Sequence, residues 1–243
     1  MHAIAVALVA ALTLGLAPHA IAAEDLDLEL VLLADSSGSI DAAESRFQRE
    51  GYATAITHPD VLAAIRQGLT QRIALTYVEW GDDTSQDVVV PWTIIDGAET
   101  AAAFADALVK APRRARGFNA IGSAIAKAQS LIDGNDINGL RRVIDISADS
   151  ANNWSGIPIE IARDAALAQG ITINGLAILC PKAGCGGRPV TYDLETAFRQ
   201  KIVGGPGHFV VTVDDKKSFA EAVRQKLILE IASNLAAAKR RKM

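Results

Sequence analysis

Three oxygen-bearing side chains stand at alternate positions near the start of the chain: Asp35, Ser37 and Ser39. A carboxylate and two hydroxyls are hard oxygen ligands of the kind that Mg²⁺ prefers, and this ion usually keeps several of its waters. The apolar run at residues 30–34 predicts a strand buried on both faces of a parallel sheet. Open α/β folds place their ligands at the carboxyl ends of such strands. The pattern predicts a divalent-cation site, although a plain polar turn at residues 36–39 explains the loop equally well.

Two further segments have a composition that suits the rest of such a site. Residues 141–148 form a mostly apolar strand pattern that ends at Asp149, with the small turn residue Ser150 after it. Residues 117–125 form a glycine-containing loop that passes into a helical pattern of Ala and Ile. Together with the first loop, these segments predict a discontinuous metal site.

The three segments resemble the metal-ion-dependent adhesion site (MIDAS) of the von Willebrand factor type A (VWA) domain. In that family the first motif is Asp-x-Ser-x-Ser, the second is a Thr in a glycine-rich loop, and the third is an Asp at a strand end. The resemblance implies that Asp35, Ser37, Ser39, Asn119 and Asp149 are the metal ligands. It implies Mg²⁺ as the ion, or Mn²⁺ or Ca²⁺ in its place. Asn119 departs from the family pattern, because it is longer than Thr and carries an amide instead of a hydroxyl.

The chain resembles one bacterial group of secreted VWA-like proteins more specifically, the domain of unknown function 1194 (DUF1194) family. The residues that carry this resemblance are Glu79-Trp80, 141–147, Asn152-Asn153, 174–176 and 204–207. They extend over nearly the whole chain after residue 23. The resemblance implies a periplasmic or secreted bacterial protein and defines no activity.

Apolar runs and helical patterns alternate along the chain, as in βαβ units. Strands are predicted near residues 26–34, 72–80, 87–92, 141–147, 171–179 and 208–213. Helices are predicted from residue 41 toward Pro59 and over residues 98–110, 120–133, 157–168, 191–202 and 216–238. The predicted fold is α/β: a Rossmann-like, doubly wound and mainly parallel sheet with helices on both faces, in three α/β/α layers.

Two local patterns predict where the first helix begins and which side of the last helix is buried. Asp41 and Glu44 have the spacing of an acidic capping box at the start of the first helix. The last helix carries Phe219, Val223, Leu227 and Ile231 at intervals of four residues, which predicts a side that faces the core.

The 243 residues, half of them hydrophobic, are enough for one large core. Residues 1–23 contain no acid, Lys or Arg, are rich in Ala, Val and Leu, and end in small residues before Glu24. They predict a signal peptide, with an N-terminal membrane anchor as the alternative. Residues 24–243 are predicted to form a single VWA-like domain without an integral membrane span.

The net charge argues against one class of partner, and the two cysteines bear on the cellular compartment. The net charge of −4, with acids and bases interspersed, argues against a nucleic-acid partner. Cys180 and Cys185 are the only cysteines. In an oxidising compartment we expect them to pair, because four residues with Pro and Gly between them let the chain turn back.

Two classes of function follow from these patterns. The first is a binding module whose ion accepts a carboxylate from a partner protein. The second is an envelope structural or assembly protein with a degenerate, metal-free site, which the substitution at Asn119 favours. An enzyme that uses the ion as a Lewis acid is the least supported class, since no positioned general base is evident. Ser36 or Ser37 could pair with His58 or His208, but no Gly-x-Ser-x-Gly elbow surrounds either serine, so we predict no catalysis.

Overall fold

The computed structural model describes residues 24–179, 190–214 and 218–241, with side chains from Asp25 to Ala232 within those ranges. Its main sheet has six strands, in the spatial order β4 (Gln86–Ile95), β3 (Ile73–Trp80), β2 (Leu28–Asp35), β6 (Arg142–Ala148), β7 (Thr172–Ile178) and β8 (Val210–Val213). Every pairing is parallel except that of the edge strand β4 with β3. The predicted mainly parallel sheet is confirmed.

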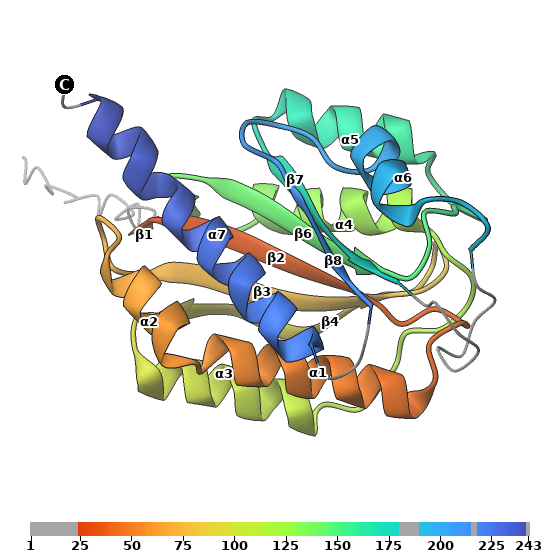
Figure 1. Ribbon diagram of the computed structural model, residues 1–243, viewed down its shortest axis with the longest axis horizontal. Coiled ribbons are helices and arrows are strands. Elements are labelled where there is room, and N and C mark those ends of the chain that lie inside the picture. Colours follow the sequence, from red (N-terminus) through yellow and green to blue (C-terminus); the bar gives the residue numbers. More distant parts are fainter. Residues whose placement is uncertain (1–23, 180–189, 215–217, 242–243) are drawn as a thin grey trace, which may run out of the picture.

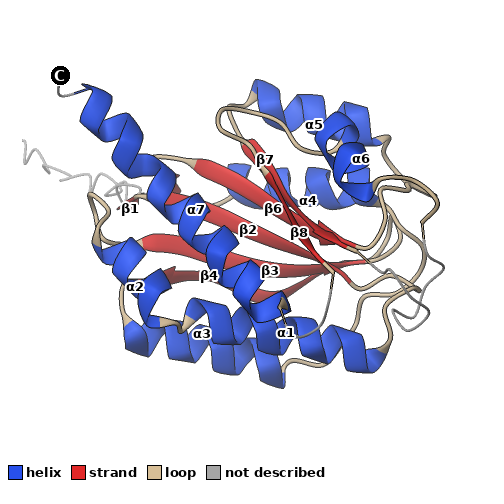
Figure 2. Cartoon of the chain, viewed as in Figure 1, coloured by secondary structure: helices blue, strands red, loops and turns tan. Residues whose placement is uncertain are grey.

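Helices cover both faces of this sheet (Figures 1 and 2). One face carries α1 (Ala42–Ile56), α2 (Pro59–Arg66), α3 (Ala98–Lys110) and α7 (Phe219–Arg241). The other face carries α4 (Ile121–Asp133), α5 (Ile159–Ala168) and α6 (Leu194–Lys201). The three-layer α/β/α fold is therefore confirmed. Within the described residues, no helix combines the length and the apolar character that a bilayer crossing requires.

Strand β2 shows how one apolar run supplies two cores. All of its residues are buried, as expected for a parallel strand covered on both faces. Leu30 and Leu32 pack in the core beneath α1 and α7, whereas Val31 and Leu33 pack in the core beneath α4. Successive side chains of a strand point to opposite faces, so the sequence alternation divides the run between the two layers.

The predicted strand at residues 26–34 is two strands in the structure. β1 (Glu24–Leu26) pairs with β5 (Ile137–Gly139), a short strand that no sequence pattern predicted, and β2 starts at Leu28. The break falls at Asp27, whose carboxylate accepts hydrogen bonds of 2.8–3.2 Å from the backbone N–H groups of residues 69–71. These contacts turn Asp27 away from a regular strand and separate the two pairings.

The first predicted helix is also followed by one that the sequence did not predict. α1 ends at Ile56, and Pro59 starts α2 at a position where its missing N–H costs nothing. The capping box is confirmed: the Asp41 carboxylate accepts from the backbone N–H of Glu44 at 2.8 Å, and Glu44 accepts from that of Asp41 at 3.1 Å. The other predicted strands and helices are present, with ends shifted by at most three residues.

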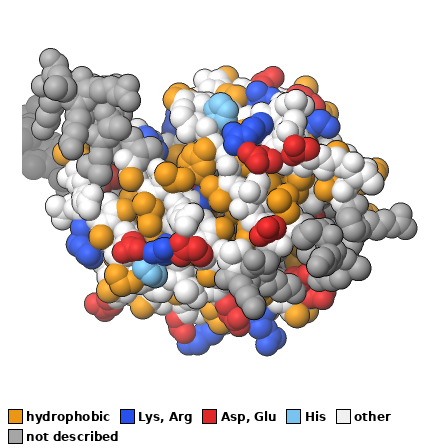
Figure 3. Space-filling view, viewed as in Figure 1, with side chains coloured by type: hydrophobic (Ala, Val, Ile, Leu, Met, Phe, Trp, Pro, Cys, Tyr) orange, Lys and Arg blue, Asp and Glu red, His pale blue; other side chains and the backbone are white. Residues whose placement is uncertain are grey.

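The C-terminal helix α7 buries its predicted apolar stripe completely. It also buries two charged residues, Lys226 and Glu230, which the stripe did not predict. On the face viewed in Figure 3, Lys and Arg side chains lie beside Asp and Glu side chains. The charges of the sequence are thus interspersed on this surface as well.

Candidate metal centre

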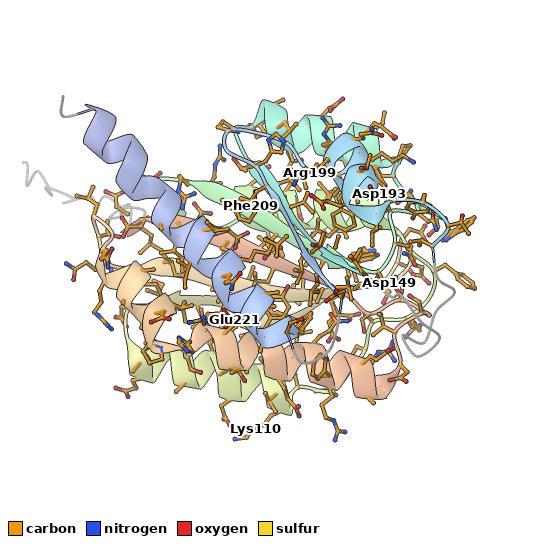
Figure 4. The ribbon with its side chains drawn as sticks, viewed as in Figure 1. Lys110, Asp149, Asp193, Arg199, Phe209 and Glu221 are labelled. Atoms are coloured by element: carbon orange, nitrogen blue, oxygen red, sulfur yellow. The ribbon has the colours of Figure 1, made fainter. Side chains whose placement is uncertain are left out.

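The sheet places Asp35 and Asp149 next to each other. β2 and β6 are adjacent parallel strands in which Ala34 lies opposite Ser147. Asp35 therefore ends β2 beside Ala148, and Asp149 is the first residue after β6. Neighbouring strands are about 4.8 Å apart, so the two carboxylates share one edge of the sheet. Asp149 lies at the right-hand end of the strands in Figure 4.

The loop after β2 adds two hydroxyls to this pair. The backbone N–H of Ser37 donates to Oδ1 of Asp35 at 2.8 Å, and the Oγ atoms of Ser37 and Ser39 are 3.2 Å apart. A hydrogen bond from Ser39 lowers the pKa of Asp149, and hydrogen bonds from Ser37 lower that of Asp35. Asp35, Ser37, Ser39 and Asp149 thus form one polar cluster.

Burial raises the pKa of both carboxylates more than those hydrogen bonds lower it, and neighbouring negative charge adds to the effect of burial. Asp35 is 1 % exposed, and desolvation followed by the charge of Asp149 raises its pKa from 3.8 to about 7. Burial and the charge of Glu44 raise the pKa of Asp149. Oδ2 of Asp35 is buried and has no hydrogen-bond partner among the described residues. A bound cation would relieve both the repulsion and the unpaired oxygen.

The side-chain oxygens of this cluster come from two acids and two serines. In the described part of the chain, no group of three or more His, Cys, Asp or Glu side chains could hold a metal ion. Two carboxylates and two hydroxyls suit a hard cation that keeps part of its water shell, and they do not suit a site built of His and Cys ligands.

Asn119 lies beside the cluster with its amide turned to Ser150. Nδ2 of Asn119 donates to Oγ of Ser150 at 2.8 Å, and both residues are buried. This bond joins the loop before α4 to the residue after Asp149. Because the amide nitrogen is engaged, Oδ1 is the atom of Asn119 that keeps lone pairs for a cation.

Arg113, for which no sequence pattern indicated a role, holds the loop after β2. Its Nε donates to Oγ of Ser36 at 2.9 Å, and its Nη2 donates to the carbonyls of Ser36 at 2.8 Å and Ile40 at 2.7 Å. The backbone N–H of Gly38 also donates to the carbonyl of Gly117 at 2.8 Å. The loop with Ser37 and Ser39 is therefore fixed by the segment between α3 and α4.

Arg49 fixes the start of that segment. Its guanidinium forms a buried, two-pronged contact with Glu79 of β3, with N···O distances of 2.7 and 2.8 Å. It also donates to the backbone carbonyl of Ala111. Helix α1, strand β3 and the start of the segment before α4 are thus joined through one side chain. Glu79 was recognisable as a family residue, but its partner lies 30 positions away and gives no local signal.

The loop after β6 is packed tightly against the start of α4. The backbone N–H of Gly122 donates to Oδ1 of Asn153 at 3.0 Å, and Nδ2 of Asn153 donates to the carbonyl of Ile157 at 3.1 Å. A Cβ on Gly122 would lie 2.0 Å from that carbonyl oxygen. Only glycine permits this approach, which keeps Asp149 and Asn119 in neighbouring loops.

Comparison with known proteins identifies the family. Residues 25–235 match the profile of the family described as "Protein of unknown function (DUF1194)". This chain is a DUF1194 protein. No curated protein matches it in sequence.

Solved structures share the fold of this DUF1194 chain. Proximal thread matrix protein 1 from the mussel byssus, with a zinc-occupied MIDAS motif, matches with a TM-score of 0.60 and 16% identity over 86% of this chain and 49% of that one. The pilus adhesin SpaC from Lactobacillus rhamnosus GG, in its open conformation, matches with a TM-score of 0.60 and 12% identity over 84% of this chain and 30% of SpaC. The vWF domain of the pili tip protein Mfa5 from Porphyromonas gingivalis matches with a TM-score of 0.51 and 8% identity over 83% of this chain and 94% of that domain.

These similarities show a VWA-like fold and nothing finer, because the identities are low. The DUF1194 chain spans about half the length of the mussel protein and under a third of SpaC.

The DUF1194 structure does not bring either histidine to the serines of the first loop. Nδ1 of His58 accepts from the backbone N–H of Asp60 at the start of α2, after α1 has run back from the site. His208 contacts the carbonyl of Gly205 in the turn before β8, at the amino end of that strand. The two histidines and the serines of the first loop therefore belong to different parts of the fold.

Two sequence predictions fall outside the described residues. These are the signal peptide at residues 1–23 and the pairing of Cys180 with Cys185.

Proposed function

We propose that this DUF1194 protein is a periplasmic or secreted VWA-like binding module that uses a divalent-cation site to bind a partner protein. Asp35, Ser37, Ser39 and Asp149 would hold the ion, and Asn119 would complete the protein shell. The observation that carries the proposal is the buried, unpartnered Oδ2 of Asp35 next to a second carboxylate.

Mg²⁺ is the proposed ion, and Mn²⁺ or Ca²⁺ would fit the same oxygen donors. The two carboxylates and two hydroxyls are fewer than the roughly six oxygens of a Mg²⁺ shell, so positions remain for water or for a partner. Bound there, the ion would supply a positive charge that an Asp or Glu of the partner can approach. The segment before α4 and the loop after β6 would then orient that carboxylate.

Two structural neighbours support this proposal. One structural neighbour has a zinc-occupied MIDAS motif, and another is a pilus adhesin. The signal peptide proposed for residues 1–23 and the pair proposed for Cys180 and Cys185 both suit the bacterial envelope.

A metal-free structural or assembly protein is the second proposal. The observation that favours it is the hydrogen bond from Asn119 to Ser150, because two loops of the site are joined there without an ion. We propose no enzymatic activity, since the described residues provide no histidine base near the serines.

Isothermal titration with MnCl₂ and MgCl₂ tests the proposal on the wild type, Asp35→Asn and Asp136→Asn. Asp35→Asn keeps the shape of the side chain and removes the charge. Asp136 is exposed beside β5, at the opposite edge of the sheet, and serves as the matched control. We expect one-site binding by the wild type and by Asp136→Asn, and none by Asp35→Asn. The absence of heat from the wild type with either ion would favour the metal-free protein instead.

A further inference from the structure

The exposed aromatic side chains of this protein lie on the loops around the candidate metal centre. The chain has six Phe, three Tyr and three Trp, and the structure describes all of them. Phe118 is 73% exposed, Trp154 is 71% exposed and Tyr192 is 39% exposed. The other aromatic residues are buried or half-buried. Exposure of aromatic rings is thus confined to the segment before α4, the loop after β6 and the segment before α6.

Hydrogen bonds or adjacency in the chain connect each of these rings to the site. Phe118 directly precedes Asn119, and the backbone N–H of Trp154 donates to the carbonyl of Asn119 at 2.8 Å. The hydroxyl of Tyr192 accepts from the backbone N–H of Ala151 at 2.9 Å, two residues after Asp149. The three rings therefore stand on the backbone that borders the two carboxylates.

Single exposed apolar side chains are ordinary on protein surfaces, but a group of aromatic rings on one functional edge is not. Aromatic side chains bring a large contact area at a small entropic cost, and they are enriched among the residues that dominate binding energy. Here the backbone N–H of Trp154 and the hydroxyl of Tyr192 are already hydrogen-bonded, so these loops would lose little conformational freedom on binding.

The charge at this edge indicates the chemistry of the partner. Arg114 and Arg116 are exposed on the segment that carries Phe118, and neither forms an ion pair with any described residue. Together with a bound cation, they would place positive charge beside Phe118, although Asp82 and Asp83 contribute negative charge next to Gly117 and Gly156 on the same edge. A neutral glycan would leave these guanidinium groups without counter-charges, whereas an acidic peptide would satisfy them.

We propose that the site binds an acidic peptide segment of a partner protein in which the Asp or Glu is flanked by an aromatic or bulky aliphatic residue. The carboxylate of this segment contacts the cation, and this part of the inference rests on the proposed function. The flanking apolar side chain packs on Phe118 and Trp154, and further acids of the segment face Arg114 and Arg116. The aromatic rings select the sequence around the carboxylate.

A library of displayed random dodecapeptides, selected on the full chain in MnCl₂, tests this proposal. Enriched peptides are synthesised with a fluorescent label, together with versions in which the acid is replaced by its amide, and their affinities are measured by anisotropy. The variants are Phe118→Ala/Trp154→Ala and the control Leu69→Ala/Leu140→Ala. The control removes two side chains that are 80% and 56% exposed on segments at the opposite edge of the sheet.

We expect enriched peptides with an acid next to Phe, Trp, Leu or Ile. The aromatic double variant should weaken their binding by at least ~10-fold, whereas the control should change it by less than about 2-fold. Mn²⁺ affinity should be the same in both variants. Three outcomes, each with Mn²⁺ still bound, would overturn this inference and leave the proposed function standing. The wild type and the aromatic double variant could bind the peptides equally well, the enriched peptides could lack acids, or no peptide could be enriched. A wild type that binds no Mn²⁺ would overturn the proposed function and the carboxylate contact with it.

Discussion

Arg113 donates from Nε to Oγ of Ser36 at 2.9 Å, across 77 positions of the chain. The same guanidinium binds the carbonyls of Ser36 and Ile40, at the two ends of the loop that carries the serines. The proposed ligands Ser37 and Ser39 lie between these anchors. The geometry of the loop after β2 therefore depends on a side chain that would not itself touch the ion.

Replacing Arg113 with Ala should weaken Mn²⁺ binding by about 10-fold and lower the free energy of unfolding by about 1–3 kcal/mol, because several hydrogen bonds to a charged group are lost. Titration calorimetry and urea unfolding measure the two effects. Arg66→Ala is the control, since Arg66 is exposed at the end of α2, away from the candidate site. Equal Mn²⁺ affinities in the wild type and Arg113→Ala would show that the loop keeps its shape without this contact.

Gly122→Ala should separate the loop after β6 from α4. The added Cβ would meet the carbonyl oxygen of Ile157 at 2.0 Å, so one of the two backbones must move. We expect a loss of about 1–3 kcal/mol in the free energy of unfolding and weaker Mn²⁺ binding. Gly97→Ala is the matched control, because no atom lies within 4 Å of a Cβ placed there and its φ of −176° suits any residue. A Gly122→Ala variant as stable as Gly97→Ala would contradict the close packing.

The elements of this fold were predictable because their signals are local. The apolar run before Asp35 predicts a buried strand, and the four-residue stripe of α7 predicts the buried side of that helix. The break at Asp27 was not predictable, because the backbone groups that its carboxylate binds lie more than 40 positions away. The short pairing of β1 with β5 depends on that break.

The candidate site also contains residues that were predictable from the sequence and residues that were not. Asp35, Ser37 and Ser39 form a contiguous motif, and Asp149 ends a strand that the register places beside β2. Arg113 and the arginine partner of Glu79 were missed, because their partners come from other elements and carry no spacing rule. The buried partner of Asp145 gives no local signal either, because it is Lys226 of α7, with Nζ 2.6 Å from Oδ1 of Asp145.

Replacing Lys226 with Met should be among the most destabilising changes in α7. Lys226 is fully buried and lies 2.6 Å from Asp145 and 2.6 Å from Glu230, and it also stacks over Phe209 at 5.1 Å. Its loss leaves two carboxylates close together in the core, which costs about 3–5 kcal/mol. Urea unfolding at pH 8 measures this.

Lys110→Met is the control for that variant, because the Lys110 side chain is 74 % exposed in its pair with Asp106. The penalty for Lys226→Met should shrink at pH 6, since protonation of Asp145 relieves the repulsion. Burial and the charge of Glu230 already raise the pKa of Asp145 to about 7 with the lysine present. A small loss that does not change with pH would show that α7 is held by its apolar stripe alone.

The pH dependence of stability should report on Asp35. An unperturbed aspartate has a pKa of 3.8, whereas the pKa of Asp35 in the folded, metal-free protein is about 7, chiefly because of burial and then because of the charge of Asp149. Between these values the folded state binds more protons than the unfolded state, so stability falls as pH rises from about 4 to about 7. The loss is on the order of 2–4 kcal/mol and is complete above pH 7.

Asp145 contributes a fall of the same sign in the same range, so Asp35→Asn isolates the part that belongs to the site. Thermal unfolding in EDTA from pH 5 to 8 should show a smaller decline for Asp35→Asn than for the wild type. With saturating Mg²⁺ the wild-type decline should diminish, because ion binding requires deprotonated carboxylates and strengthens as pH rises to about 7. Parallel profiles of the two proteins in EDTA would mean that Asp35 keeps an ordinary pKa, and the charge repulsion on which the proposed cation site rests would be absent.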